Sequence, residues 1–270
     1  MGSLDVDRIQ NMTAMELFQT QLSSSSAEAH TDALKRLSVV AVSLGKEKAR
    51  KELIPFLLDL GMGNSSPQAQ SDEVLLILGQ EIIPVAQWIC TESLPEWLPL
   101  LERLATAEET VVRDQAVVCF QEFASLDPKM NVQPWVAICK RLAGADWFTP
   151  KVSACGVTAA TLQLEKAPVA ELLALYSDLS SDETPMVRRA AAKYIGKVLE
   201  KAGPSAIITT TPNSSSLNLQ PLCRDEQDSV RLLAVGALSQ VGPAFGEANT
   251  AWTAQNWLPL VKEGSTDMSW

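Results

Sequence analysis

Apolar residues recur along the chain at the spacing of helices that bury one face. In segment 187–199 they fall at i, i+3, i+4, i+7, i+8, i+11 and i+12, while Arg188, Lys193 and Lys197 fall outside this stripe. Positions with this spacing form one continuous face of an α-helix. The same spacing joins Trp97, Leu100, Leu101, Leu104 and Ala105. Strand-like alternation does not compete with this pattern, so it predicts helices.

A Val-Arg-x-x-Ala motif recurs at 112–116, 187–191 and 230–234. Lys151 and Leu75 occupy the register of its arginine in two further segments, and the five register positions lie 38, 38, 37 and 43 residues apart. A second apolar segment precedes this register in most units. A period of about 37 to 47 residues with two helices per unit is typical of HEAT and armadillo repeats. We therefore predict an all-α fold, a right-handed α-solenoid of HEAT repeats with about six helical hairpins and a partial seventh.

One such hairpin cannot bury both of its faces, so neighbouring units must stack. We expect a single solenoid over residues 1–270, with units at 8–45, 46–90, 91–127, 128–165, 166–202 and 203–247 and a partial unit at 248–270. The last unit ends before its own register position. This leaves two alternatives, a fragment of a longer array or a final helix with an exposed apolar face.

Local signals mark where single helices begin and bend. Thr184 followed by Pro185 is typical of an N-cap residue with proline at the first helical position. Pro55, Pro99 and Pro259 lie in the first helix of their units. They are expected to bend those helices, because a proline inside a helix removes a hydrogen bond and clashes with the preceding turn.

Two pairs of opposite charge indicate how neighbouring units are joined. Asp182 lies six residues before Arg188, and Asp225 lies six before Arg231. We predict a ladder of Asp–Arg contacts through the turns, in which each arginine reaches the aspartate of its own or of the adjacent repeat. The ladder is incomplete, because alanine replaces the acid in two units, at Ala107 and Ala145.

The composition favours a protein-binding role. Hydrophobic residues make up 46% of the 270 residues, which is ample for a packed core, and the formal net charge is −10. Such a charge opposes binding to nucleic acid or to an anionic membrane, so a protein partner with basic patches fits better. The chain opens on no recognisable secretory signal, and no apolar run approaches about 18 residues. We therefore expect a cytoplasmic protein, with the nucleus as the alternative.

Residues that could carry chemistry are few. The five cysteines form no Cys-x-x-Cys pair, and His30 is the one histidine. Both findings argue against a metal site and favour reduced thiols in the core. A nucleophilic triad would depend on His30 alone, and no Gly-rich phosphate loop is present. We expect no enzymatic activity, no cofactor and no metal.

Five segments, 107–114, 140–149, 153–156, 182–192 and 225–235, resemble the scaffold (A) subunit of protein phosphatase 2A, a HEAT-repeat family also described as its 65 kDa regulatory subunit. The resemblance runs from about residue 34 to residue 270 and corresponds to roughly the N-terminal half of that family's array. It implies a horseshoe in which the turns between the two helices of each repeat form a ridge. In that family the N-terminal part of the ridge receives interchangeable regulatory (B-type) subunits, and the far C-terminal repeats receive the catalytic subunit.

Carried over position by position, the resemblance implies that partner contacts are made by Glu108, Glu109, Asp146, Trp147, Phe148, Thr149, Pro185, Met186, Arg188, Arg189, Asp225, Glu226 and Trp270. A catalytic subunit would be bound only if further C-terminal repeats exist. Exposed tryptophan and arginine beside acidic groups are typical of binding hot spots.

Structural roles compete with binding for several of these residues. Trp147 and Phe148 can instead fill space between units, Arg188 can belong to the ladder, and acidic residues at helix starts can stabilise the helix dipole. Two other functions also remain open. One is a HEAT adaptor of another class, such as a transport or assembly factor, and the other is an enzyme that uses His30.

Overall fold

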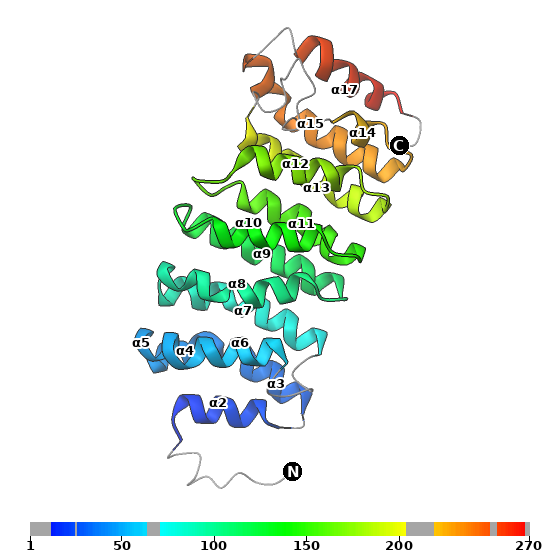
Figure 1. The fold of residues 1–270 in the computed structure, drawn as a ribbon. Coiled ribbons are helices and arrows are strands. Elements are labelled where there is room, and N and C mark those ends of the chain that lie inside the picture. The colour runs from blue at the N-terminus through cyan, green and yellow to red at the C-terminus, as the bar shows by residue number, and fades with distance from the viewer. Residues whose placement is uncertain (1–11, 25, 64–70, 204–218, 249–252, 268–270) are drawn as a thin grey trace. The chain divides into compact units, whose positions relative to one another are not determined.

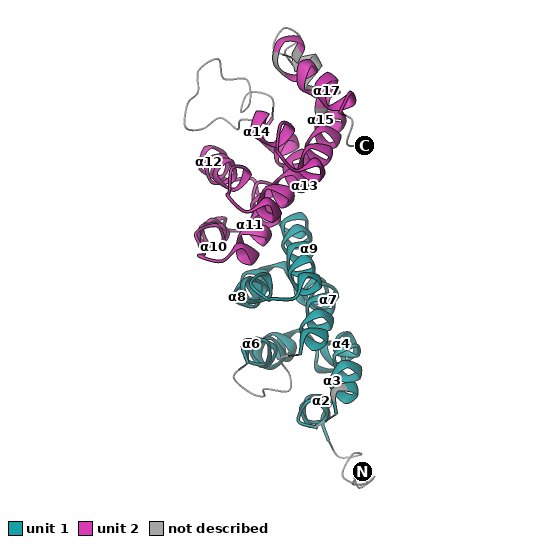
Figure 2. Cartoon of the chain, turned by 90° about the vertical axis from the view of Figure 1, so that its right-hand side faces the viewer, with its two compact units in different colours: residues 1–127 teal, residues 128–270 magenta. Residues whose placement is uncertain are grey.

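The computed structural model describes residues 12–24, 26–63, 71–203, 219–248 and 253–267, and no strand occurs among them. The chain divides into two compact units, Met1–Asp127 and Pro128–Trp270 (Figure 2). Each unit is a stack of helical hairpins, in which a first helix (A) turns into a second (B) that packs beside it (Figure 1). The predicted all-α class is confirmed.

The described part of the first unit contains three hairpins. Its first consists of α2 (Ala14–Leu22) followed by a divided B helix, α3 (Ala27–Leu34) and α4 (Leu37–Leu44). Its second consists of α5 (Lys46–Lys48), the π-helical segment η1 (Ala49–Leu53) and α6 (Ile54–Met62), then α7 (Asp72–Ile89). Its third consists of the 3-10 segment η3 (Thr91–Ser93) and α8 (Leu94–Ala105), then α9 (Thr110–Leu126).

The apolar stripe predicted for the third hairpin forms its core. Trp97, Leu100 and Leu104 on α8 are fully buried, as are Phe120 and Phe123 on α9. α9 also packs on α7, where the amide of Gln115 and the thiol of Cys119 both donate to the Gly79 carbonyl, at 3.3 and 3.1 Å. The packing between hairpins therefore includes polar contacts as well as apolar ones.

The second unit continues the same pattern. Its hairpins are α10 (Gln133–Ala143) with α11 (Phe148–Thr161), α12 (Val169–Ser180) with α13 (Pro185–Ala202), and the short α14 (Gln220–Cys223) with α15 (Asp228–Ala248). The π-helical segment η5 (Thr253–Trp257) and α17 (Leu258–Ser265) follow. The B helices form one layer, in which α13 packs between α11 and α15, and α10 and α12 lie on one side of it (Figure 2).

Small residues let the B-helix layer pack closely in this unit. Every residue from Ser153 to Thr161 of α11 is buried. On α13 the apolar stripe predicted from the sequence is buried except at Tyr194, which is half-buried. Tyr176 of α12 is fully buried, and its hydroxyl donates to the Ala191 carbonyl at 2.6 Å, which joins the two helices of this hairpin.

Prolines mark changes of helix type in two A helices. Pro55 and Pro259 each lie in the first turn of an α-helix that directly follows a π-helical segment. The residue before each of these α-helices is itself helical, so each proline lies within a continuous helical run, and the π-helical turn stands where the missing N–H interrupts the hydrogen-bond ladder. Pro99 lies inside α8. Two B-to-A connections begin with glycines at positive φ, Gly45 at 79° and Gly203 at 74°, a conformation that other residues rarely adopt.

We expect opposite effects from two Gly→Ala substitutions in helices. A Cβ on Gly61 would overlap Cδ1 of the fully buried Leu100, whereas a Cβ on Gly236 meets nothing within 4 Å. Gly61→Ala should therefore lower the free energy of unfolding by about 1–2 kcal/mol, because overpacking outweighs the helix propensity of alanine. Gly236→Ala should raise it by about 0.5–1 kcal/mol. Urea unfolding followed by circular dichroism measures both, and equal effects of the two changes would contradict this packing.

Candidate partner-binding turns

The candidate contact residues cluster at the turns between A and B helices. We name these turns by residue range, turn 3 (106–109) in the first unit, and turn 4 (144–147), turn 5 (181–184) and turn 6 (224–227) in the second. Turns 5 and 6 share one local structure. The Asp182 carboxylate accepts the Thr184 N–H at 2.8 Å, and Asp225 accepts the Gln227 N–H at 2.9 Å. Aspartate closes a turn in this way because its short side chain reaches the backbone two residues on.

Thr184 is the N-cap residue of α13 and Pro185 follows in the first turn, as predicted. The Thr184 side chain, however, makes no capping hydrogen bond. The aspartate two residues earlier holds the Thr184 backbone instead, so the turn is ordered by Asp182.

Arg188 joins turn 5 to turn 6. Its Nη1 donates to the carbonyls of Asp182 and Glu183, at 3.0 and 3.1 Å, within its own turn. Its Nε and Nη2 donate to the two carboxylate oxygens of Asp225, at 2.5 and 3.2 Å. Nη2 also donates to Glu226 at 3.0 Å. The fork of a guanidinium matches a carboxylate in two parallel bonds, which sets the orientation of both turns.

The same arrangement recurs on both sides of Arg188. Arg231 donates to the Asp225 carbonyl of its own turn at 2.8 Å and to the Asp267 carboxylate at 2.6 Å. Lys151, which stands in the arginine register, reaches Asp182 at 3.0 Å. The predicted ladder is confirmed within the second unit, and each basic side chain bonds to the acid of the following repeat.

Arg113 makes only the first half of this arrangement. It is buried, and its Nη1 donates to the carbonyls of Ala107 and Glu108 in its own turn. In the sequence, the position that would supply the next acid is Ala145. Within the described part of the chain, Arg113 Nε has no hydrogen-bond partner.

Two large apolar side chains stand exposed at the turns of the second unit. Trp147, the N-cap residue of α11, is 67% exposed, and Met186 in the first turn of α13 is 56% exposed. The Trp147 ring lies 5.3 Å from the ring of the half-buried Phe148. Asp146 and Glu183 are exposed beside them. The turns therefore present apolar groups within an acidic surface.

The other candidates divide by exposure. Arg188 and Asp225, with side chains only 12% and 3% exposed, are paired with each other. Trp270 lies outside the described residues. Thr149 is half-buried. Exposed residues are Glu108, Glu109, Pro185, Arg189 and Glu226.

The structure adds one exposed residue that the sequence reasoning missed. Val111 on α9 is 50% exposed. It lies two residues before Arg113, as Met186 lies two before Arg188, so the repeat register contained the signal for it.

The groups that could carry catalysis serve packing. His30 is buried, and its Nε2 bonds to the Ser24 carbonyl at 2.7 Å. Burial raises the pKa of Cys119 to about 12 and that of Cys139 to about 11, so both thiols stay protonated at neutral pH. In the ranges that the structure covers, no group of three or more His, Cys, Asp or Glu side chains could hold a metal ion. None of the described helices is long and apolar enough to cross a bilayer.

Comparison with known proteins connects these turns to a family, although no family model matches the chain. The regulatory A-type subunit of protein phosphatase PP2A from Saccharomyces cerevisiae is 31% identical over 98% of this chain and 42% of its own length. A probable PP2A regulatory subunit of Caenorhabditis elegans is 35% identical over 85% of this chain and 38% of its own. The chain is a homologue of the A-type regulatory subunits of PP2A.

The beta isoform of the 65 kDa A-type regulatory subunit of Homo sapiens agrees, with 38% identity over 67% of this chain and 30% of its own length. This A-type homologue spans less than half the length of the curated relatives that it matches. The resemblance predicted from the turn segments is confirmed.

We expect the buried contact between turns to matter more than an exposed one. Arg188→Gln leaves the Asp225 carboxylate buried without its cation, and it should lower the free energy of unfolding by about 2 kcal/mol. Arg224→Gln breaks a pair with Glu263 in which both side chains are about half exposed, and it should cost less than about 1 kcal/mol. Chemical unfolding of both variants measures the difference, and the idea fails if Arg224→Gln costs as much as Arg188→Gln.

The Asp182 contacts should produce a dependence of stability on pH. Burial by itself raises the pKa of Asp182, but the bonds from Thr184 and Lys151 outweigh it and hold the pKa below the ordinary 3.8. A carboxyl with a lowered pKa stabilises the fold above its unfolded value, and this contribution disappears as the pH falls through the folded value. The stability gap between the native chain and Asp182→Asn should therefore be constant from about pH 6 to 8 and close below about pH 4.

Lys151→Gln serves as the control for this titration. Because it removes the cation that lowers the pKa of Asp182, the gap should be smaller in that background at neutral pH. A gap that persists unchanged to about pH 2.5 would show that the charge of Asp182 is irrelevant to stability.

Proposed function

We propose that this chain is a non-catalytic subunit of a PP2A-like serine/threonine phosphatase and that its A-to-B turns bind regulatory subunits of the B type. The proposal rests on the homology to A-type regulatory subunits and on the chemistry of the turns. Binding of a catalytic subunit requires, on this proposal, further repeats C-terminal to those present here.

The exposed Trp147 is the observation that carries the proposal. A tryptophan with two thirds of its surface in water gains free energy when a partner covers it, and such residues dominate binding in many interfaces. Phe148 supports the ring from one side, and Met186 adds a second apolar group at the next turn. The partner surface that fits is an apolar pocket with basic groups opposite the exposed Asp146 and Glu183 and an acidic group opposite the exposed Arg189.

The Arg–Asp contacts make this surface rigid before binding. Turn 5 is tied through Lys151 to α11, the helix that Trp147 caps, and through Arg188 to turn 6. A surface that is ordered in the free protein loses less conformational entropy when it binds. The buried residues of the ladder therefore support the exposed ones and do not need to touch the partner.

A non-catalytic role agrees with the surroundings of the histidine and of the core cysteines. The buried His30 is held by a backbone carbonyl, and the core thiols are protonated. We infer that the chain acts by placing other subunits.

Binding of purified B-type regulatory subunits to the immobilised 270-residue chain tests the proposal. Trp147→Ala should weaken binding by about 2 kcal/mol, or roughly 30-fold, while the stability of the chain changes little because the side chain is exposed. Arg189→Glu in the first turn of α13 should also weaken it, whereas Lys201→Glu in the last turn of the same helix should not. The proposal is wrong if no B-type subunit binds, or if Trp147→Ala and Lys201→Glu bind equally well.

A further inference from the structure

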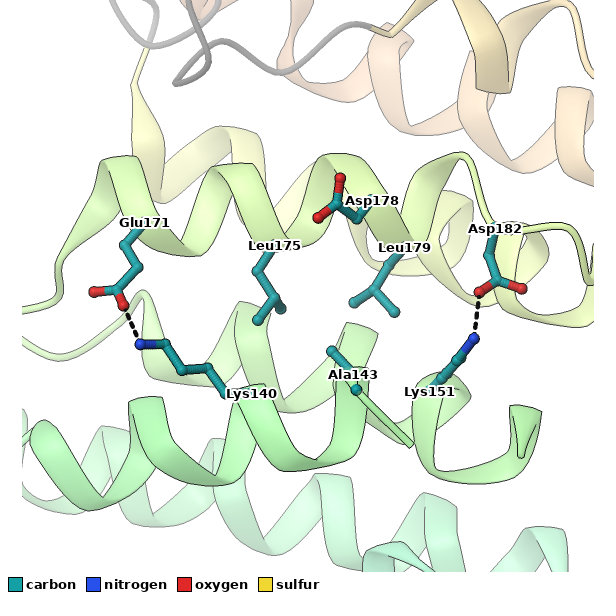
Figure 3. Close-up of a pocket in the computed structure, with 9 residues that line it drawn as sticks. Lys140, Ala143, Lys151, Glu171, Leu175, Asp178, Leu179 and Asp182 are labelled. Carbon is teal, nitrogen blue, oxygen red and sulfur yellow. Dashed lines mark hydrogen bonds and ion pairs between the residues drawn. The ribbon is translucent and has the colours of Figure 1, made fainter. Parts of the chain in front are cut away.

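A groove lies between two A helices of the second unit (Figure 3). It has a volume of about 430 Å³ and is lined by α10 and α12, with Gly144 and Lys151 beyond the end of α10. This volume is within the range of about 300 to 1,000 Å³ that is typical of ligand-binding clefts. We refer to it as the α10–α12 groove. Its lining reaches Gly144 of turn 4 and Asp182 of turn 5, but it does not include the exposed Trp147 and Met186.

The floor of the groove is apolar. Leu175 and Leu179 project from α12 toward Ala143 at the end of α10 (Figure 3). Ala143 and Gly144 are small, and they leave open the space that larger side chains would fill between two stacked helices. Leucine side chains on one wall and an alanine on the other suit the side chain of an aliphatic residue.

Ion pairs close the groove at both ends. Lys140 pairs with Glu171 at 2.5 Å at one end, and Lys151 pairs with Asp182 at 3.0 Å at the other (Figure 3). The four charges cancel in pairs. They also limit the length of any apolar ligand and offer polar groups to the backbone of a bound peptide.

One charge of the groove remains uncompensated. Asp178 lies on α12 at the exposed rim of the groove, where its carboxylate does not project toward α10 as the two leucines do (Figure 3), and it has no ion pair with any residue that the structure describes. The lining therefore carries three carboxylates against two ammonium groups. The formal charge of −10 on the whole chain adds a long-range attraction for cations.

We propose that the α10–α12 groove binds a short extended peptide segment of a partner protein, with an aliphatic side chain on Leu175 and Leu179 and an arginine or lysine at Asp178. The charge of the lining selects a basic segment, and its apolar floor selects an adjacent aliphatic residue. The proposal does not depend on the phosphatase function, because it rests on the lining of the groove alone.

Methyl NMR of the full 270-residue chain, labelled at leucine and alanine, tests the proposal. The probe is the peptide acetyl-Gly-Leu-Arg-Leu-Gly-amide, and the comparison peptide carries citrulline, a neutral isostere of arginine. The arginine peptide should shift the methyl signals of Leu175, Leu179 and Ala143, with an affinity about fivefold or more above that of the citrulline peptide. No saturable shift of these signals with the arginine peptide would overturn the proposal.

Two variants locate the site and one controls for net charge. Asp178→Asn should bind both peptides equally, because the charge that distinguishes them is gone. Ala143→Leu should abolish the shifts by filling the groove while both ion pairs remain. Glu200→Gln removes one negative charge from the exposed face of α13, outside the groove, and should leave the preference for arginine intact. A preference that survives in Asp178→Asn, or binding that survives in Ala143→Leu, would place the peptide elsewhere.

Discussion

One contact organises the second unit of this protein, that of a basic side chain at the start of a B helix with the acid of the following turn. A guanidinium has five N–H donors in one plane, and Arg188 directs Nη1 at two carbonyls of its own turn and Nε and Nη2 at Asp225 and Glu226. Apolar faces alone would let neighbouring hairpins slide over one another at modest cost. The bidentate contact fixes their register, because it is satisfied in one relative position only.

This contact also separates the acidic residues of the turns into two groups. Asp182 and Asp225 point inward, where each closes its own turn and receives a basic side chain from the preceding repeat. Glu183 and Glu226, one residue later, are exposed. The internal acids hold the turns rigid, and the outer acids give the turns their negative surface. Met186 thus follows a turn whose buried acid is already paired, whereas the turn of Trp147 has Ala145 in place of that acid and is followed by Lys151 of α11, which pairs with Asp182.

The Lys151–Asp182 pair belongs to two features at once. It is one step of the ladder, and it closes one end of the α10–α12 groove. The ammonium group of lysine is a single point charge. It therefore lacks the planar fork of donors with which Arg188 bonds both to carbonyls of its own turn and to a carboxylate. The groove thus lies beside the ladder contact that lysine makes in place of arginine.

The sequence by itself determined the helices, the two-helix repeat, the Asp–Arg pairs and the family, because all of these depend on local spacing that recurs from unit to unit. It also located Trp147 and Met186 at turns, since both stand next to the repeated motif. Only the tertiary structure decided which acid of a turn is buried and which is exposed. Asp225 and Glu226 are adjacent carboxylates, and their burial differs because the adjacent repeat covers Asp225 and not Glu226. The groove likewise required the fold, because Ala143 lies 32 residues before Leu175 and forms one surface with Leu175 and Asp178 only when α10 and α12 stack.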